Sequence, residues 1–117
     1  MTKMTTEEAF VKVLQTHGIE QAFGIIGSAF MPISDLFPAA GITFWDVAHE
    51  TNGGLIADGY TRATGKMSMV IAQNGPGITG LVTPIKTAYW NHTPLLLVTP
   101  QAANKTCLLY TSPSPRD

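Results

Sequence analysis

The chain opens with a polar stretch that passes into apolar residues at helical spacing. Thr5 and Glu8 have the spacing of a capping box, in which each side chain bonds the backbone N–H of the other residue. The apolar residues that follow are Ala9, Phe10, Val13 and Leu14. Their spacing predicts an amphipathic helix, and Gly18 stands where such a helix would end.

Short apolar runs then alternate with helical patterns. Four runs rich in β-branched, aromatic or aliphatic residues predict strands: residues 22–26, 42–45, 69–72 and 95–98. The helical patterns between them cover three segments: residues 30–37, 50–64 and 78–89. Pro38 is expected to end the first of these helices and Gly65 the second.

The two longer helical patterns differ in the size of the residues that they place on one face of the helix. The helix over 50–64 carries small residues that permit close backbone approach: Gly53, Gly54, Ala57 and Ala63. The helix over 78–89 has one apolar face, of the kind that normally turns toward a core. That face is made of Ile78, Leu81, Val82, Ile85 and Tyr89.

Strands that alternate with helices predict βαβ units and a parallel sheet. The run 95–98 is apolar without alternation, as required of a strand covered on both faces. A chain of 117 residues has room for one domain at most. We therefore expect an α/β domain with helices on both faces of a parallel sheet.

Composition narrows the class of protein. A hydrophobic fraction of 44% with 13% charged residues is typical of a folded core and too apolar for disorder. The formal net charge of -1, without a basic cluster, gives no reason to expect nucleic acid or an anionic membrane as a partner. The first eight residues lack the apolar core of a signal peptide, and no apolar run approaches a membrane span. The single cysteine, Cys107, excludes an intrachain disulfide, and we expect a cytoplasmic protein.

The last residues break the pattern. Residues 107–117 read Cys-Leu-Leu-Tyr-Thr-Ser-Pro-Ser-Pro-Arg-Asp and continue neither a helical nor a strand repeat. They match the translation of a transposase-type sequencing adapter, so we interpret them as a non-native tail, with a natural Pro/Ser-rich linker as the alternative. On this interpretation residues 1–106 are a partial N-terminal domain, and the natural protein continues beyond Thr106.

Several familiar motifs are absent. Gly24-Ile25-Ile26-Gly27 lacks the spacing of a dinucleotide-binding fingerprint. Residues 59–66 have one residue too many for a P-loop and lack its Ser or Thr. Position 53, where a zinc-protease helix starting at His49 needs its second His, is Gly.

Two segments are distinctive in combination. Residues 49–65 read His-Glu-Thr-Asn-Gly-Gly-Leu-Ile-Ala-Asp-Gly-Tyr-Thr-Arg-Ala-Thr-Gly, and residues 73–80 read Gln-Asn-Gly-Pro-Gly-Ile-Thr-Gly. A Glu that opens a helix, then Ala-Asp-Gly-Tyr, a strand and a Gly-Pro-Gly turn, resembles the pyrimidine-binding (Pyr) domain of the acetolactate synthase-like thiamine-diphosphate enzymes. The resemblance covers nearly all of residues 5–104. It implies a flavodoxin-like Pyr domain, here truncated.

The resemblance implies roles for particular residues. In the family a Glu at this place hydrogen-bonds ring nitrogen N1′ of the aminopyrimidine of thiamine diphosphate and helps the cofactor to lose its C2 proton. Glu50 is therefore the expected catalytic and cofactor-binding residue. Gly27 and the turn Gly75-Pro76-Gly77 are the other expected cofactor-binding residues, through close approach of their backbone to the pyrimidine ring.

The resemblance also implies partners that this segment does not supply. Mg²⁺ binds the cofactor's diphosphate in a later domain of these enzymes, so no metal ligand is expected here. The Glu of one subunit serves cofactor held mainly by another, so a homodimer or homotetramer is expected. Departures at Ile26-Gly27-Ser28 and at residues 91–94 point to a subfamily. Residues 24–37, 88–94 and 101–106 resemble the subfamily that cleaves the small molecule sulfoacetaldehyde and passes its two-carbon unit to phosphate. The segment alone is expected to be inactive.

Other interpretations of the same residues stay open. Glu50 can be an ordinary first-turn Glu favoured by the helix dipole, and the glycines can be turn residues. An acetolactate synthase or related carboligase shares the motifs, and a non-catalytic α/β binding domain shares the fold. Asp58 and Arg62, four residues apart, are expected to form a structural ion pair. His49 and His92 are lesser candidates for the site.

Overall fold

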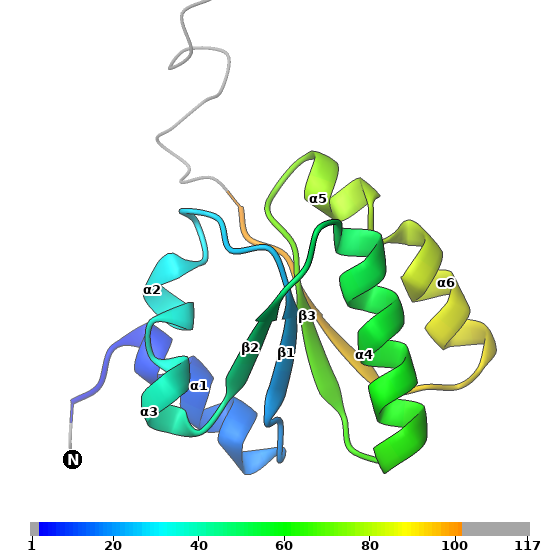
Figure 1. The fold of residues 1–117 in the computed structure, drawn as a ribbon. Helices are drawn as coiled ribbons and strands as arrows, with labels where there is room; N and C mark the ends of the chain where they lie inside the picture. Colours follow the sequence, from blue (N-terminus) through cyan, green and yellow to red (C-terminus); the bar gives the residue numbers. More distant parts are fainter. Residues whose placement is uncertain (1–2, 102–117) are drawn as a thin grey trace, which may run out of the picture.

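A computed structural model of the chain describes residues 3–101. Its strands form one four-stranded parallel sheet in the order β2-β1-β3-β4 (Figure 1). The strands are β1 (Gln21–Gly24), β2 (Thr43–Asp46), β3 (Ser68–Ile71) and β4 (Leu95–Val98). The chain passes outward from β1 to β2 and then returns to the other side of β1, as in flavodoxin-like sheets.

Helices cover both faces of this sheet. They are α1 (Thr6–Thr16), α2 (Met31–Ser34), α3 (Phe37–Ala40), α4 (Glu50–Thr64), α5 (Pro76–Thr79) and α6 (Val82–Trp90). Helices α1, α2 and α3 lie on one face, and α4 and α6 lie on the other (Figure 1). The α/β class with a doubly covered parallel sheet, expected from the sequence, is confirmed.

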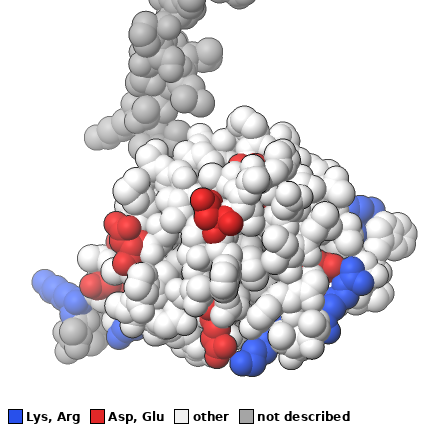
Figure 2. All heavy atoms as spheres, in the orientation of Figure 1, with Lys and Arg blue, Asp and Glu red and all other residues white. Residues whose placement is uncertain are grey.

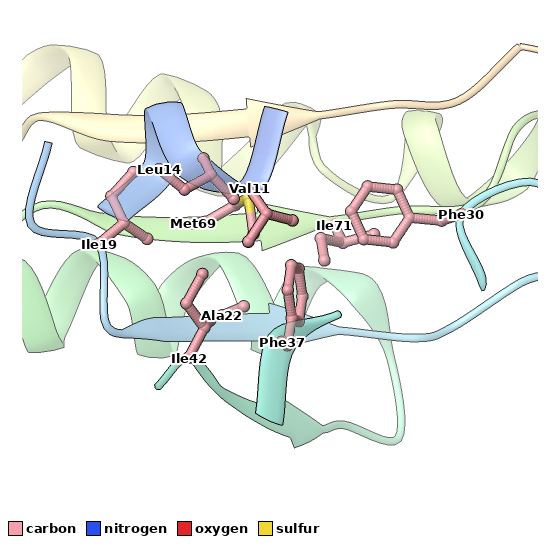
Figure 3. Close-up of a cluster of buried hydrophobic side chains, with 9 residues drawn as sticks. All are labelled: Val11, Leu14, Ile19, Ala22, Phe30, Phe37, Ile42, Met69 and Ile71. Atoms are coloured by element: carbon pink, nitrogen blue, oxygen red, sulfur yellow. The ribbon is translucent and has the colours of Figure 1, made fainter. Parts of the chain in front are cut away.

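Each face of the sheet has its own hydrophobic core. The core under α1 to α3 consists of Val11, Leu14, Ile19, Ala22, Phe30, Phe37, Ile42, Met69 and Ile71 (Figure 3). The core under α4 and α6 consists of Phe23, Ala57, Val70, Ala72 and Leu81. The central strands β1 and β3 supply alternate residues to the two cores, because successive side chains of a strand point to opposite faces.

Helix α1 starts as the capping box predicts. The Thr5 N–H donates to Glu8 Oε2 at 2.8 Å, and the Glu8 N–H donates to Thr5 Oγ1 at 3.2 Å. The buried residues of the helix are Val11 and Leu14, whereas Val13 is exposed. The assignment of Val13 to the apolar face is therefore wrong. Val11, three residues before Leu14, occupies that face instead.

The expected helix over residues 30–37 is in fact two short helices. Residues 35 and 36 separate α2 from α3. Pro38 does not end a helix but lies in the first turn of α3. Proline is tolerated there, because the first N–H groups of a helix have no partner within it.

Helix α4 has the predicted bounds and packs closely on α6. Gly65 caps its end with a φ of 71°. A Cβ built on Gly54 would lie only 2.5 Å from Cβ and Cγ of Pro84, so the absence of a side chain lets the two helices touch. Gly53 and Ala57 are also buried, but Ala63, expected on the same face, is exposed.

The inner face of α6 is not the one that the sequence pattern predicts. Its buried residues are Pro84 and Ala88, with Leu81 just before the helix. Val82 and Tyr89, expected on the apolar face, are 64% and 71% exposed. Contact between Gly54 and Pro84 sets the rotation of the helix, so a set of apolar side chains is left on the surface.

The expected ion pair within α4 is confirmed. Arg62 Nε donates to Asp58 Oδ2 at 2.9 Å. Asp58 is only 2% exposed, so the pair lies partly under the helix rather than across its surface. Among residues 3–101 no helix is both long and apolar enough to cross a bilayer.

Candidate functional site

The candidate site lies where the strand order reverses. The segment after β1 leads to α2 on one face, and the segment after β3 leads to α5 and α6 on the other face. Figure 1 shows both segments at the same end of the sheet as the start of α4. Open α/β sheets bind ligands at such a switch point, outside the carboxyl ends of the strands.

At the switch point, the Gln73 side chain packs against Gly27. A Cβ built on Gly27 would lie 2.1 Å from Gln73 Oε1, so no larger residue fits without moving the amide. Among the described residues, Gln73 Oε1 is buried and has no hydrogen-bond partner. A buried carbonyl oxygen without a donor is uncommon in folded proteins. A ligand N–H group would satisfy it.

Glu50 is placed by the start of α4. His49 precedes it as the N-cap, and its Nδ1 accepts a hydrogen bond from the Thr51 N–H at 3.1 Å. The half-buried Glu50 side chain points to α5: a Cβ built on Gly77 would lie 3.1 Å from Glu50 Oε1. The two ion pairs within residues 3–101 are Arg62–Asp58 and Lys66–Glu20, so Glu50 takes part in neither.

The Gly-Pro-Gly segment brings the backbone to this carboxylate. Gly75 has φ 75° and ψ -121°, a conformation that glycine adopts readily and other residues do not. Pro76 then occupies the first position of α5. Gly77 is buried between Glu50 and Ala72. The turn expected from the sequence is therefore present, and it lies against Glu50.

The two histidines considered for the site occupy different ends of the molecule. His49 is exposed at the start of α4, and its Cε1 would lie 3.4 Å from a Cβ on Gly80. His92 is exposed just before β4 and so lies at the amino-terminal edge of the sheet. That edge is opposite the one that carries Glu50. Within the described chain, His92 therefore does not share the site.

Two further polar residues of the site were not singled out from the sequence. Gln73 was visible only as a polar residue directly after a buried strand. Thr51 donates its hydroxyl to the Gly80 carbonyl at 2.6 Å. Neither contact has a signature in the sequence, because each joins segments that are far apart along the chain.

A family model described as "Thiamine pyrophosphate enzyme, N-terminal TPP binding domain" matches residues 4–112. The chain belongs to the thiamine pyrophosphate enzyme family. The match includes every residue of the site, from Gly27 to Gly80. The predicted tail, residues 107–117, lies outside the described residues, and its origin stays a prediction.

Relatives of the chain differ in their sequence identity to it. It is 83% identical over 104 residues to "Sulfoacetaldehyde acetyltransferase" from Roseovarius nubinhibens, covering 89% of the chain. It is 38% identical over 103 residues to "Acetolactate synthase" from Arthrospira platensis, covering 85% of the chain. The chain spans only 17% and 18% of the length of these two relatives.

A solved structure with a similar chain path has the same fold. It is described as a putative thiamin diphosphate-dependent enzyme from Mycobacterium smegmatis and superposes with a TM-score of 0.83. The superposition covers 92% of the chain and 20% of that protein, at 24% identity. At this identity the similarity establishes the fold alone.

The residues at the switch point fit the pyrimidine half of thiamine pyrophosphate. An aminopyrimidine offers ring nitrogens that accept hydrogen bonds and an amino group that donates them. Among residues 3–101, Glu50 has a carboxyl group free of ion pairs, and Gln73 has a buried acceptor without a donor. Gly27 and Gly77 carry no side chain at the points where Gln73 and Glu50 approach them. No cluster of three or more His, Cys, Asp or Glu in the described part of the chain could hold a metal ion.

Proposed function

We propose that the chain is the N-terminal, pyrimidine-binding segment of a longer enzyme that converts sulfoacetaldehyde and phosphate to acetyl phosphate and sulfite. The identity of 83% to a sulfoacetaldehyde acetyltransferase, against 38% to an acetolactate synthase, supports this substrate class. The observation that carries the catalytic part is the Glu50 carboxyl group, which lies against Gly77 at the switch point and has no ion pair in the described part of the chain.

Glu50 would hold a proton at ring nitrogen N1′ of the cofactor. When bound, thiamine diphosphate supplies a nucleophilic carbon at C2 of its thiazolium ring, and the protein's part is to place and polarise it. The Glu50 carboxyl group can share a proton with a ring nitrogen because no cation competes for it within residues 3–101. From the start of α4 its side chain points to Gly77 in α5.

The other residues of the site would orient the pyrimidine ring. The Gln73 Oε1 atom would accept a hydrogen bond from the ring's amino group, which would satisfy this buried oxygen. Gly27, Gly75, Pro76 and Gly77 would present backbone to the ring, as the resemblance implies. Of these, Gly27 and Gly77 border on Gln73 and Glu50 respectively.

The rest of the active site would lie outside this segment. Mg²⁺ would bind with the diphosphate in the remainder of the longer protein, since the chain spans 17% of its relative's length. The surface in Figure 2 carries no gathered patch of Lys or Arg, and the cations in this view lie at its margins. The family match agrees with a small-molecule substrate. The cytoplasmic location stays a prediction.

The outer face of α6 supports a homodimer. We define this face by Val82, Ile85, Tyr89 and Trp90, all exposed, with Lys86 over the two aromatic rings. Large apolar side chains grouped on one surface commonly mark an interface. We propose that a second copy of the enzyme covers this face, as the resemblance implies for a family whose active site is shared between subunits.

The proposed dimer can be tested by substituting two exposed valines, one on the outer face of α6 and one on α1. In the full-length enzyme, Val82→Glu should weaken self-association about 10²-fold or more, because the interface would have to desolvate an added carboxylate. Val13→Glu, which places the same charge on the exposed side of α1, should leave association unchanged. Sedimentation velocity over a concentration series measures both. Equal association of the two variants would contradict an interface on α6.

The proposed reaction is tested by supplying the full-length enzyme with two alternative substrates. With sulfoacetaldehyde and phosphate, acetyl phosphate and sulfite should form in equal amounts, with a kcat/KM at least about 10²-fold above that for pyruvate. The 117-residue chain alone should form neither product, because it would supply only part of the site. Acetolactate formation from pyruvate as the main activity would instead support the carboligase interpretation.

A further inference from the structure

One side-chain hydrogen bond ties the start of α4 to the junction between α5 and α6. Thr51 Oγ1 donates to the backbone carbonyl of Gly80, with 2.6 Å between the two oxygens. The bond is partly buried and joins residues 29 positions apart. It therefore fixes the first turn of α4, where Glu50 lies, against a different element of the fold.

The Gly80 carbonyl is available because of a proline. Gly80 and Leu81 have nearly helical backbone angles, and the Ile85 N–H donates to the Leu81 carbonyl four residues earlier. By the same pattern the Gly80 carbonyl would accept from residue 84. Residue 84 is Pro, which has no N–H to donate. The Thr51 hydroxyl takes the place of that missing donor.

The same proline fixes α4 at a second point. Pro84 packs on Gly54, where a Cβ would come within 2.5 Å of it. Gly54 lies three residues after Thr51, about one turn further along α4. Helix α4 is thus held to the α5–α6 segment by the Thr51–Gly80 hydrogen bond and by packing that includes the contact of Gly54 with Pro84.

Glu50 lies between these contacts and α5. A Cβ on Gly80 would lie 3.5 Å from Glu50 Cβ, and one on Gly77 would lie 3.1 Å from Glu50 Oε1. The His49 cap cannot hold this arrangement, because its hydrogen bond to the Thr51 N–H is local to the start of α4. Thr51 Oγ1 is the group that links the turn carrying Glu50 to the α5–α6 junction beside Gly77.

We propose that Thr51 is a positioning residue, whose hydrogen bond to Gly80 holds the Glu50 carboxyl group over Gly77. The inference rests on the proposed function of Glu50. Loss of the hydroxyl leaves the Gly80 carbonyl without its donor and frees the first turn of α4 to shift. A small shift of a group that must meet a ring nitrogen within hydrogen-bond distance slows the reaction, because proton transfer depends steeply on geometry.

The test compares two substitutions of Thr51 in the full-length enzyme. Thr51→Val keeps the shape of the side chain and removes the donor, whereas Thr51→Ser keeps the donor. Thr64→Val is the matched control: Thr64 lies at the far end of α4, and its hydroxyl donates to the Tyr60 carbonyl at 2.7 Å. Thr51→Ala replaces the valine variant if that protein is insoluble.

The main measurement is the rate of deuterium exchange at C2 of bound thiamine diphosphate, without substrate. Thr51→Val should slow this exchange about tenfold, as expected for one lost hydrogen bond, and lower kcat by a similar factor with little change in KM. Thr51→Ser should restore the exchange rate to within about threefold. Thr64→Val should exchange at the parent rate, whatever its effect on the melting temperature.

The Glu50→Gln variant distinguishes failure of the positioning role of Thr51 from failure of the proposed function of Glu50. If Glu50→Gln slows C2 exchange but Thr51→Val exchanges at the parent rate, Thr51 does not position the carboxyl group and the inference is overturned, while the function of Glu50 stands. If Glu50→Gln itself exchanges at the parent rate, the proposed function fails and the inference fails with it. An equal loss in Thr51→Ser and Thr51→Val would also overturn the role of the hydroxyl.

Discussion

The full-length enzyme with Glu50→Gln is expected to turn over about 10²-fold or more slowly than its parent. The amide has the size of the carboxyl group and can still donate a hydrogen bond to a ring nitrogen. It cannot take up or release a proton. The contacts of the residue with Gly77 and Gly80 should persist, because the substitution leaves the Thr51–Gly80 hydrogen bond in place. The loss therefore reports proton handling rather than packing.

Initial rates of acetyl phosphate formation measure this effect, with cofactor affinity titrated separately. Glu7→Gln is the matched control, because Glu7 also lies in the first turn of a helix but in α1, on the other face of the sheet. If Glu50 served only to favour the helix dipole, both variants would lose little activity. Unchanged turnover in Glu50→Gln would support the non-catalytic binding domain instead.

Elements with strong local signals were predicted well from the sequence. Helix α4 has the predicted bounds, because a helical pattern runs without interruption up to a glycine that caps it. The capping box of α1 and the strand β4 were also found where the residues indicate. In each case residues within one segment suffice to determine the structure.

Features that depend on distant segments could not be predicted in this way. The inner face of α6 follows from the contact of Pro84 with Gly54, not from the apolar period of its own residues. Strand β1 ends at Gly24, two residues earlier than predicted, because its pairing with β3 ends there. The Phe37–Pro38 step continues into a second short helix, although a proline pattern alone suggests a stop.

In the candidate site, too, some features could be inferred from the sequence and others depend on contacts between distant segments. Glu50 and the turn Gly75-Pro76-Gly77 were inferred from resemblance to a family, since spacing alone permits a first-turn Glu and an ordinary turn. The structure adds that these residues meet at the switch point of the sheet, and that Gln73 lies against Gly27. The proline-dependent link from Thr51 to Gly80 was not foreseen, because it requires the packing of α4 on α6 to be known.

Among glycine-to-alanine substitutions in the sheet, Gly24→Ala should lower the stability of the fold most. Gly24 pairs with Ile71 at the end of β1, and a Cβ at this position would lie 2.1 Å from the Ile71 carbonyl oxygen. The φ of Gly24 is 153°, which an L side chain rarely adopts. Gly53 of α4 also approaches closely, since its own Cβ would lie 3.5 Å from the Gly24 backbone. The added carbon must therefore separate β1 from β3, because backbone atoms cannot rotate away as a side chain can.

We expect Gly24→Ala to lower the free energy of unfolding by about 3 kcal/mol or more, from overpacking and backbone strain together. Gly41→Ala separates the two causes: Gly41 has a φ of 75°, but a Cβ there meets no atom within 4 Å, so only strain of about 1 kcal/mol is expected. Urea unfolding of the 117-residue chain, followed by circular dichroism, gives both values if the m-value is unchanged. Equal losses would mean that β1 and β3 are not in close contact at Gly24. Since Gly27 and Gln73 continue from those same two strands, their placement at the switch point depends on this contact.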